Sequence, residues 1–142
     1  SYKGARYSDE VLPSLEPLYL GKKFTKLSEV NRTFIEWICS FLGISTKITD
    51  SADYQLVDGK TERLLNLCQQ AGATEYISGP AASSYLDSTL FDEAGIVLSI
   101  FDYDGYLPYP QLWGEFEHGV TILDLILNCG PEARNYLRFV GS

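Results

Sequence analysis

Residues 44–102 alternate between strand-like and helix-like segments, and this alternation constrains the fold more than any other feature of the sequence. The strand-like segments are 44–49, 74–78 and 96–101, and helical patterns separate them. Strands separated by helices join into parallel sheets through right-handed crossovers. The sequence therefore predicts an α/β fold, a small three-layer unit with a short parallel sheet. The unbroken apolar run Ile96–Phe101 predicts a strand covered on both faces.

The segments on either side of this region predict helices that flank the sheet. Residues 28–42 carry apolar side chains at helical spacing, and Gly43 follows as a stop signal. A helix is also expected over residues 121–139, with a break where Gly130 ends one helix and Pro131 begins the next. A chain of 142 residues suits a single domain over residues 1–142.

Composition excludes several classes of function. The net charge of −8 disfavours a nucleic-acid partner, because affinity for a phosphate backbone rests on Lys and Arg clusters. No apolar run approaches 18 residues and no signal peptide is visible, so we expect a cytoplasmic protein without a membrane span. Cys39, Cys68 and Cys129 lie far apart in apolar helical contexts, which predicts buried thiols and no metal site. No cofactor is expected.

Ligands of an open parallel sheet bind beyond the carboxyl ends of its strands, which here include the segment SGPAAS. Ser78 and Gly79 end the second predicted strand, and Pro80 suits the first position of a helix. The backbone N–H groups of that helix start could face an anion. A plain strand-to-helix turn with a serine cap explains the same residues, and both interpretations stay open.

The segment KTER begins the helix after the first predicted strand. Lys60 and Arg63 lie in its first turn, where positive charge opposes the helix dipole. This pair could meet a carboxylate or a phosphate of a substrate. A solvated helix start is the other interpretation.

The segment 103–118 is rich in Pro, Tyr and Trp and predicts an irregular loop. Tyr109, Gln111 and His118 are its candidate substrate-binding residues, because aromatic loops with a few polar groups often line small-molecule pockets. His118 is the only histidine, and a structural role is the alternative for it.

The predicted C-terminal helix carries polar residues inside an apolar stretch. Thr121 and Asp124 match a capping box, and Asn128 lies one turn further on. Buried polar groups need partners, so we expect Asp124 and Asn128 to hold the aromatic loop or another segment by hydrogen bonds. A structural role for the pair and a role in the ligand site both stay open.

These residues, taken in order, resemble the WbqC-like protein family. The resemblance rests on KTERLLNLCQQAGATEYISGPAASSYLD, on Tyr109 and Gln111 as Y-x-Q, and on TILDLILNCGPEARNYL, and it covers most of the chain. It implies a bacterial protein associated with O-antigen, other surface-glycan or secondary-metabolite biosynthesis, and a role in aminoacyl transfer. Family members begin with an H-Q-P-x-Y-L-P segment, which nothing before Ser1 supplies here. We therefore expect a match to the later, larger part of such a protein, without any chemistry that segment carries.

Two functions follow as hypotheses. The first is a transferase, or its C-terminal portion, that moves an aminoacyl or acyl group onto an amine such as that of an amino sugar. Its site would combine Lys60, Arg63, Ser78 and Gly79 with the loop residues Tyr109, Gln111 and His118. The second is a non-catalytic domain that binds a small or carrier-bound substrate for another enzyme. Association with the missing N-terminal segment, or with further copies of the chain, is expected in either case.

Overall fold

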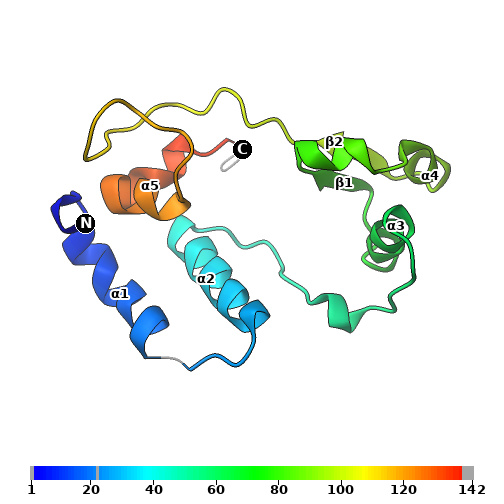
Figure 1. Cartoon of the computed structure of the whole chain (residues 1–142), viewed down its shortest axis with the longest axis horizontal. Coiled ribbons are helices and arrows are strands. Elements are labelled where there is room, and N and C mark those ends of the chain that lie inside the picture. Colours follow the sequence, from blue (N-terminus) through cyan, green and yellow to red (C-terminus); the bar gives the residue numbers. More distant parts are fainter. Residues whose placement is uncertain (1, 22, 139–142) are drawn as a thin grey trace. The chain divides into compact units, whose positions relative to one another are not determined.

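The computed structural model describes residues 2–21 and 23–138, which form two compact units (Figure 1). The first, which we call the helical unit, combines Ser1–Thr46 with Gly105–Ser142. The second, which we call the sheet unit, spans Lys47–Asp104. Each unit has its own apolar core. The single domain expected over residues 1–142 stays a prediction.

The helical unit packs three α-helices around one core. They are α1 (Ser8–Leu20), α2 (Leu27–Leu42) and α5 (Ile122–Cys129), and short 3-10 helices lie at Tyr2–Gly4 and Gly130–Tyr136. Helix α5 is apolar on nearly every side, and every residue from Asp124 to Cys129 is buried. A helix that is hydrophobic all round must lie inside its domain. Helix α5 accordingly contacts α1, and its 3-10 continuation contacts α2.

The sheet unit contains a parallel pair of strands and two helices. The order is α3 (Thr61–Gln70), β1 (Glu75–Ser78), α4 (Ser88–Glu93) and β2 (Val97–Ile100), with 3-10 helices at Ser51–Asp53 and Pro80–Ser84. Glu75 pairs with Val97 and Ser78 with Ile100 in parallel register. Phe91 of α4 is fully buried and stacks on Tyr76 at 5.4 Å between ring centroids. The parallel pairing of the last two predicted strands is thus confirmed.

The prediction of a first strand over residues 44–49 is wrong, because no strand forms there in the described structure. The N–H of Ile44 donates to the carbonyl of Cys39 at 2.8 Å, and Gly43 takes a left-handed φ of 67°. Both features complete the C-terminal cap of α2. Ile44 then packs against the core of the helical unit. Its apolar side chain therefore belongs to the end of α2 and not to a strand.

The expected third layer is also missing from the described residues. Ile77 and Val97 lie on one face of the two-stranded sheet and are each 59% exposed. Tyr76 and Leu98 lie on the opposite face and pack against the core that Cys68, Phe91 and Ile96 form. The β2 strand is therefore covered on one face only, and the sheet unit has two layers.

The remaining helices follow the sequence closely. The helix expected at 28–42 is α2, and the break expected at Gly130 ends α5. Gly130 adopts φ 53° and ψ −131°, a backbone conformation that residues with a Cβ atom rarely adopt. A Cβ atom at this position would also overlap the ring of Tyr7. The last residue of the expected 121–139 helix lies outside the described residues.

Gly130→Ala should lower the free energy of unfolding by about 3 kcal/mol, because backbone strain and the overlap with Tyr7 act together. Gly114→Ala is the matched control, since Gly114 also has a positive φ of 65° but meets no atom within 4 Å. Its cost should be about 1 kcal/mol. Urea unfolding of both variants measures the difference. Equal losses in the free energy of unfolding would show that contact with Tyr7 does not restrict the residue at position 130.

Candidate functional site

Helix α5 positions the polar residues of the candidate site. Thr121 is the N-cap, and its Oγ1 accepts the backbone N–H of Leu123 at 3.4 Å. Asp124 and Asn128 are only 4% and 8% exposed. The expected burial of this pair is therefore confirmed. Thr121 caps the helix, whereas the carboxylate of Asp124 is bonded to side chains of the loop that precedes the helix.

The carboxylate of Asp124 joins α5 to the aromatic loop. Its Oδ2 accepts the hydroxyl of Tyr109 at 2.7 Å and Nε2 of Gln111 at 3.1 Å. Tyr2, from the start of the chain, lies close enough to Asp124 for the carboxylate to raise the pKa of its phenol. Burial of a carboxylate is costly unless donors meet it, and two donors meet this one. The expectation that Asp124 holds the aromatic loop is confirmed, whereas Asn128 donates only to the carbonyl of Asp124 in its own helix.

Gln111 fixes the shape of the loop. Its Nε2 donates to the carbonyl of Glu117 at 2.9 Å, and its Oε1 accepts the N–H of Glu117 at 2.9 Å. These two bonds close the loop on itself at the point where Gln111 reaches Asp124. The ring of Tyr109 meets Phe116 edge-on at 5.0 Å and Tyr136 at 5.7 Å between centroids. Tyr109 and Gln111 thus belong to a packed and hydrogen-bonded cluster.

Burial and Asp124 together change the acidity of both tyrosines. The pKa of Tyr109 is raised well above its ordinary value of 10.0, first by burial and then by its hydrogen bond to Asp124. The pKa of Tyr2 is also raised, first by burial and then by the neighbouring Asp124. Neutral phenols donate hydrogen bonds and phenolates do not. The Tyr109 hydroxyl therefore stays a donor to the Asp124 carboxylate.

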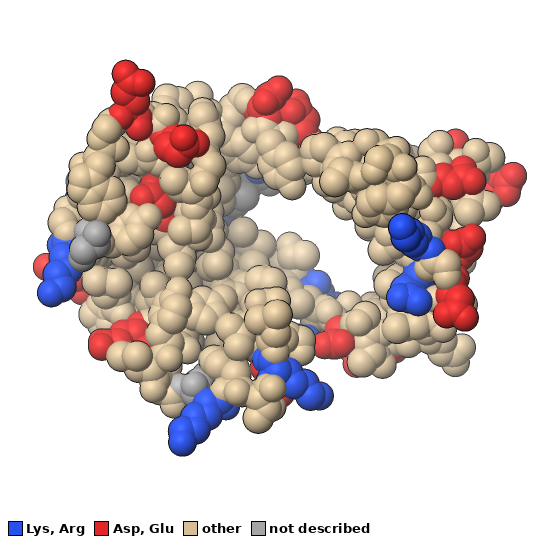
Figure 2. Space-filling view, in the orientation of Figure 1, with Lys and Arg blue, Asp and Glu red and all other residues tan. Residues whose placement is uncertain are grey.

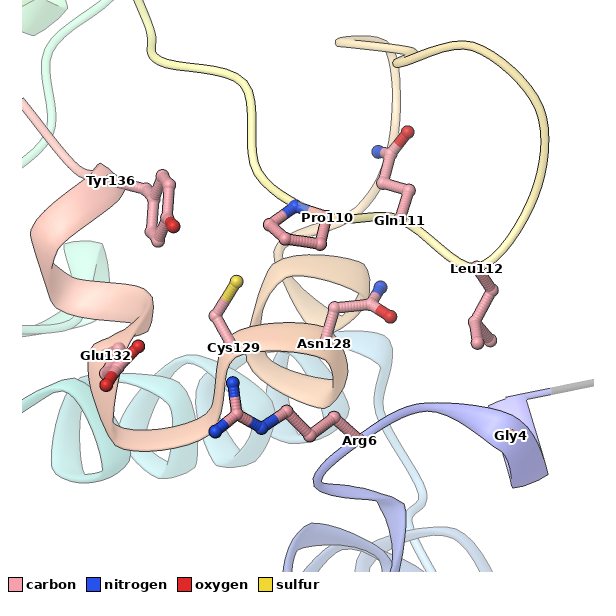
Figure 3. A pocket seen from close by; sticks show the side chains of 9 residues that line it. All are labelled: Gly4, Arg6, Pro110, Gln111, Leu112, Asn128, Cys129, Glu132 and Tyr136. Carbon is pink, nitrogen blue, oxygen red and sulfur yellow. The ribbon is translucent and has the colours of Figure 1, made fainter.

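A pocket of about 240 Å³ opens beside this cluster, within the helical unit (Figure 3). Asn128, Cys129, Glu132 and Tyr136 reach it from α5 and the following 3-10 helix. Arg6 enters from the N-terminal segment. The other lining residues are Gly4, Pro110, Gln111 and Leu112. One guanidinium, one carboxylate, two amides and one thiol therefore face a small space.

Cys129 supplies the thiol of this pocket. Figure 3 shows its sulfur pointing to the space between Tyr136 and Pro110. The pKa of Cys129 is raised, mainly by burial and then by the negative charges of Glu132 and Asp124, while Arg6 opposes this rise. The thiol is therefore protonated at neutral pH and is not an activated nucleophile.

His118 lies in the aromatic loop but not among the residues that line the pocket. It is exposed, and its ring meets Phe116 edge-on at 4.6 Å. A role of His118 in substrate binding stays a prediction.

The other four predicted site residues belong to the sheet unit. Arg63 donates from Nε to the carbonyl of Val57 at 3.0 Å and approaches Asp58 at 3.9 Å. The ammonium group of Lys60 lies over the ring of Tyr85 at 5.9 Å. These contacts hold Arg63 and Lys60 against neighbouring residues of the sheet unit. They favour the second interpretation of KTER, a helix start without a bound anion.

Thr61, in the KTER helix start, contacts the segment that follows SGPAAS in the chain. Its Oγ1 donates to the carbonyl of Tyr85 at 3.4 Å and accepts the N–H of Asp87 at 3.2 Å. The carbonyl of Ser78 accepts the N–H of Phe101 at 2.7 Å, so Ser78 extends the sheet. Gly79 precedes a 3-10 helix that Pro80 opens, as expected. A ligand pocket shared by the two segments stays a prediction.

The seven predicted binding residues are thus divided between the units. Lys60, Arg63, Ser78 and Gly79 lie in the sheet unit, whereas Tyr109, Gln111 and His118 lie in the helical unit. Their combination in one site stays a prediction. The described residues contain no group of three His, Cys, Asp or Glu side chains that could hold a metal ion. No helix in this part of the chain is long and apolar enough to cross a membrane.

Sequence reasoning missed most of the pocket residues. Glu132 and Tyr136 lie beyond the break at Gly130, in a 3-10 helix, so no helical spacing relates them to Asn128 of α5. Arg6 gave no local signal either, because its place beside α5 depends on tertiary packing.

Two comparisons with known proteins give matches. The model of the WbqC-like protein family matches residues 1–136. An uncharacterized protein of Mycobacterium tuberculosis, Rv1507c, is 55% identical over 139 residues, which cover 98% of this chain and 60% of that protein. The chain thus spans well under two thirds of the length of this relative. No solved structure matches the chain significantly.

Asp124→Ala should lower the free energy of unfolding by roughly 1–3 kcal/mol, because it leaves Tyr109 and Gln111 without their shared acceptor. Urea unfolding measures the loss. Glu16→Ala, at an exposed position of α1, is the control and should change stability by less than about 0.5 kcal/mol. Equal stability of the two variants would contradict a structural role for Asp124.

Stability should fall as the pH rises above about 10, because the folded chain holds the proton of Tyr109 more tightly than the unfolded chain does. The stabilisation is fully present below the ordinary tyrosine pKa of 10.0 and is lost as the pH rises toward the raised pKa of the folded state. Urea unfolding between about pH 9 and 11 should show a shallower fall for Tyr109→Phe than for the unmodified chain.

Tyr19→Phe is the control for this experiment, since Tyr19 belongs to the same unit and is 60% exposed. Its pH profile should match that of the unmodified chain. Identical slopes for all three proteins would show that the Tyr109 proton is not linked to folding.

Proposed function

Because this chain belongs to the WbqC-like protein family, we propose that it is the substrate-binding part of a transferase. The transferred group is an aminoacyl or acyl group, and the acceptor is an amine. The reaction would serve the biosynthesis of a bacterial surface glycan, such as an O-antigen, or of a secondary metabolite. The activity of a whole family member is part of this proposal, since the chain spans 60% of its relative in Mycobacterium tuberculosis.

The pocket beside α5 is the observation that carries the proposal. It brings together a cation from Arg6, an anion from Glu132 and the amide of Asn128. Small-molecule sites of this kind combine apolar walls with a few fixed polar groups. Leu112 and Pro110 supply apolar walls, and the hydrogen-bonded Asp124 cluster holds the helix and loop in place. The space accommodates a small polar molecule.

The proposed transfer forms one bond and breaks one bond at the acyl carbon. The amine nitrogen attacks the acyl carbon of a thioester, a C–N bond forms, the C–S bond breaks, and the thiol leaves with the proton of the amine. Proximity and orientation of the two reactants supply much of the rate in such bimolecular reactions. A pocket that only binds and orients the reactants is therefore sufficient for a useful acceleration.

One observation favours the second candidate function, a binding domain without catalysis. The carboxylate of Asp124 is already hydrogen-bonded to two side chains, and Cys129 is a protonated thiol. Among the described residues that line the pocket, neither an activated nucleophile nor a histidine base is present. In this alternative the chain holds a small or carrier-bound substrate for another enzyme.

The proposed ligand is a small or carrier-bound molecule and not a nucleic acid. The net charge of −8 supports this choice. On the face shown in Figure 2, the Lys and Arg side chains stand in small separate groups with Asp and Glu side chains between them. We further propose a cytoplasmic location, where activated acyl donors are made.

Incubation of the chain with aminoacyl and acyl thioesters and a panel of amines tests the proposal, with mass spectrometry of every amine. The proposed transferase adds the mass of the acyl group to at least one amine and releases the thiol. Arg6→Gln should slow this transfer tenfold or more, because Arg6 lines the pocket. Lys3→Gln is the matched control from the same segment and should not slow it.

Measurable binding of an amine or thioester without any transfer would contradict the transferase and support the binding domain. The longer relative from Mycobacterium tuberculosis, assayed in parallel, shows whether transfer needs residues that this chain does not cover.

A further inference from the structure

Asp124 and Asn128 lie one helical turn apart but have different hydrogen-bonding states. The carboxylate of Asp124 accepts hydrogen bonds from Tyr109 and Gln111. Asn128 is 92% buried, yet only its Nδ2 is engaged, in a bond to the carbonyl of Asp124 at 2.8 Å. No described residue donates to its Oδ1. Since no fully buried side-chain nitrogen or oxygen of the described residues lacks a hydrogen-bond partner, this oxygen is open to solvent and free to accept a hydrogen bond.

The bond from Nδ2 fixes the direction of the free oxygen. Because the amide is planar, Oδ1 points away from the Asp124 carbonyl. Asn128 lines the pocket, and Figure 3 shows its amide on the side where Gln111 and Leu112 lie. The pocket therefore contains an oriented acceptor for an N–H group of a ligand.

The pocket also contains one charge of each sign. Arg6 and Glu132 both line it, and the charges of both act on the thiol of Cys129. Neither residue forms an ion pair in the described part of the chain, although Arg6 lies over the ring of Tyr7 at 5.1 Å. A ligand with a single charge would leave one of these two groups unmatched. A ligand with both charges satisfies both.

We propose that this pocket binds a free amino acid, whose carboxylate lies on Arg6 and whose ammonium group donates to Oδ1 of Asn128. Glu132 adds a favourable field for the ammonium group, and the amino-acid side chain extends along Leu112 and Pro110. Arg6 can bind a carboxylate through two parallel hydrogen bonds. The assignment rests on the proposed function for one point only, the role of the bound amine as the acceptor of the acyl group.

This assignment separates two kinds of acceptor. An amino sugar offers an ammonium group but no carboxylate, so Arg6 would stay unmatched. An amino acid carries both groups on one carbon atom, so it can meet Arg6 and Asn128 in the same pocket. The pocket volume of about 240 Å³ also leaves room for an apolar side chain.

Calorimetric titration of the whole chain with four compounds tests the assignment. The compounds are leucine, isoamylamine as leucine without its carboxylate, 4-methylpentanoate as leucine without its ammonium group, and glucosamine. Leucine should bind at least tenfold more tightly than each of the other three. Equal or tighter binding of isoamylamine or glucosamine would overturn the assignment, and so would the absence of leucine binding at millimolar concentration.

Variants of Asn128 and Arg6 test the two proposed contacts separately. Asn128→Ala should weaken leucine and isoamylamine binding about tenfold and leave 4-methylpentanoate binding unchanged. Arg6→Gln should weaken leucine and 4-methylpentanoate and leave isoamylamine unchanged, while Lys3→Gln should change none of them. If Asn128→Ala loses thermal stability but keeps its affinity for leucine, Asn128 is a structural residue. This result would contradict the proposed contact between Asn128 and the ammonium group. The four-compound series decides the ligand class even if a variant fails to fold.

The two proposals fail in different experiments. The titrations need no acyl donor, so tight leucine binding without any acyl transfer contradicts the transferase and leaves the amino-acid site standing. Acyl transfer to an amino sugar, with no affinity for leucine, contradicts the amino-acid site and leaves the transferase standing.

Discussion

The helical unit depends on one buried carboxylate. Asp124 lies inside an apolar helix, and its burial is tolerated because Tyr109 and Gln111 both donate to its carboxylate. Both donors come from the aromatic loop that precedes the helix, so one side chain joins α5 to this loop. Removing the carboxylate takes the shared acceptor from both donors at once, which costs more than a single hydrogen bond contributes.

The pocket is a consequence of this arrangement. Once Tyr109 and Gln111 are held against α5, the next turn of the helix presents Asn128, and the 3-10 helix after Gly130 presents Glu132 and Tyr136 to the same space. The residue that holds the loop, Asp124, and the residue that lines the pocket, Asn128, are therefore distinct, although both are polar residues of one helix. Precise ligand geometry generally requires such support behind the contacting residue.

The sequence predicted local elements better than it predicted contacts. The α2 helix, the break at Gly130, the parallel pairing of β1 with β2 and the bond from Asp124 to the aromatic loop all follow from periodicity, stop signals and the need of buried polar groups for partners. The strand expected at 44–49 does not form, because Ile44 completes the cap of α2 and packs against the core of the helical unit. The alternation of apolar residues in the sequence does not reveal such tertiary packing. The pocket role of Arg6 was invisible for a similar reason, since no local pattern places it beside α5.

A double-mutant cycle on Tyr109 and Asp124 tests the central claim most directly, because it isolates their coupling from the cost of each change alone. The single variants Tyr109→Phe and Asp124→Asn and the double variant would be unfolded in urea at neutral pH. A buried, charge-assisted bond of 2.7 Å predicts a coupling free energy of about 1–3 kcal/mol. Additive losses, with a coupling below about 0.3 kcal/mol, would show that this carboxylate does not hold the loop and the helix together.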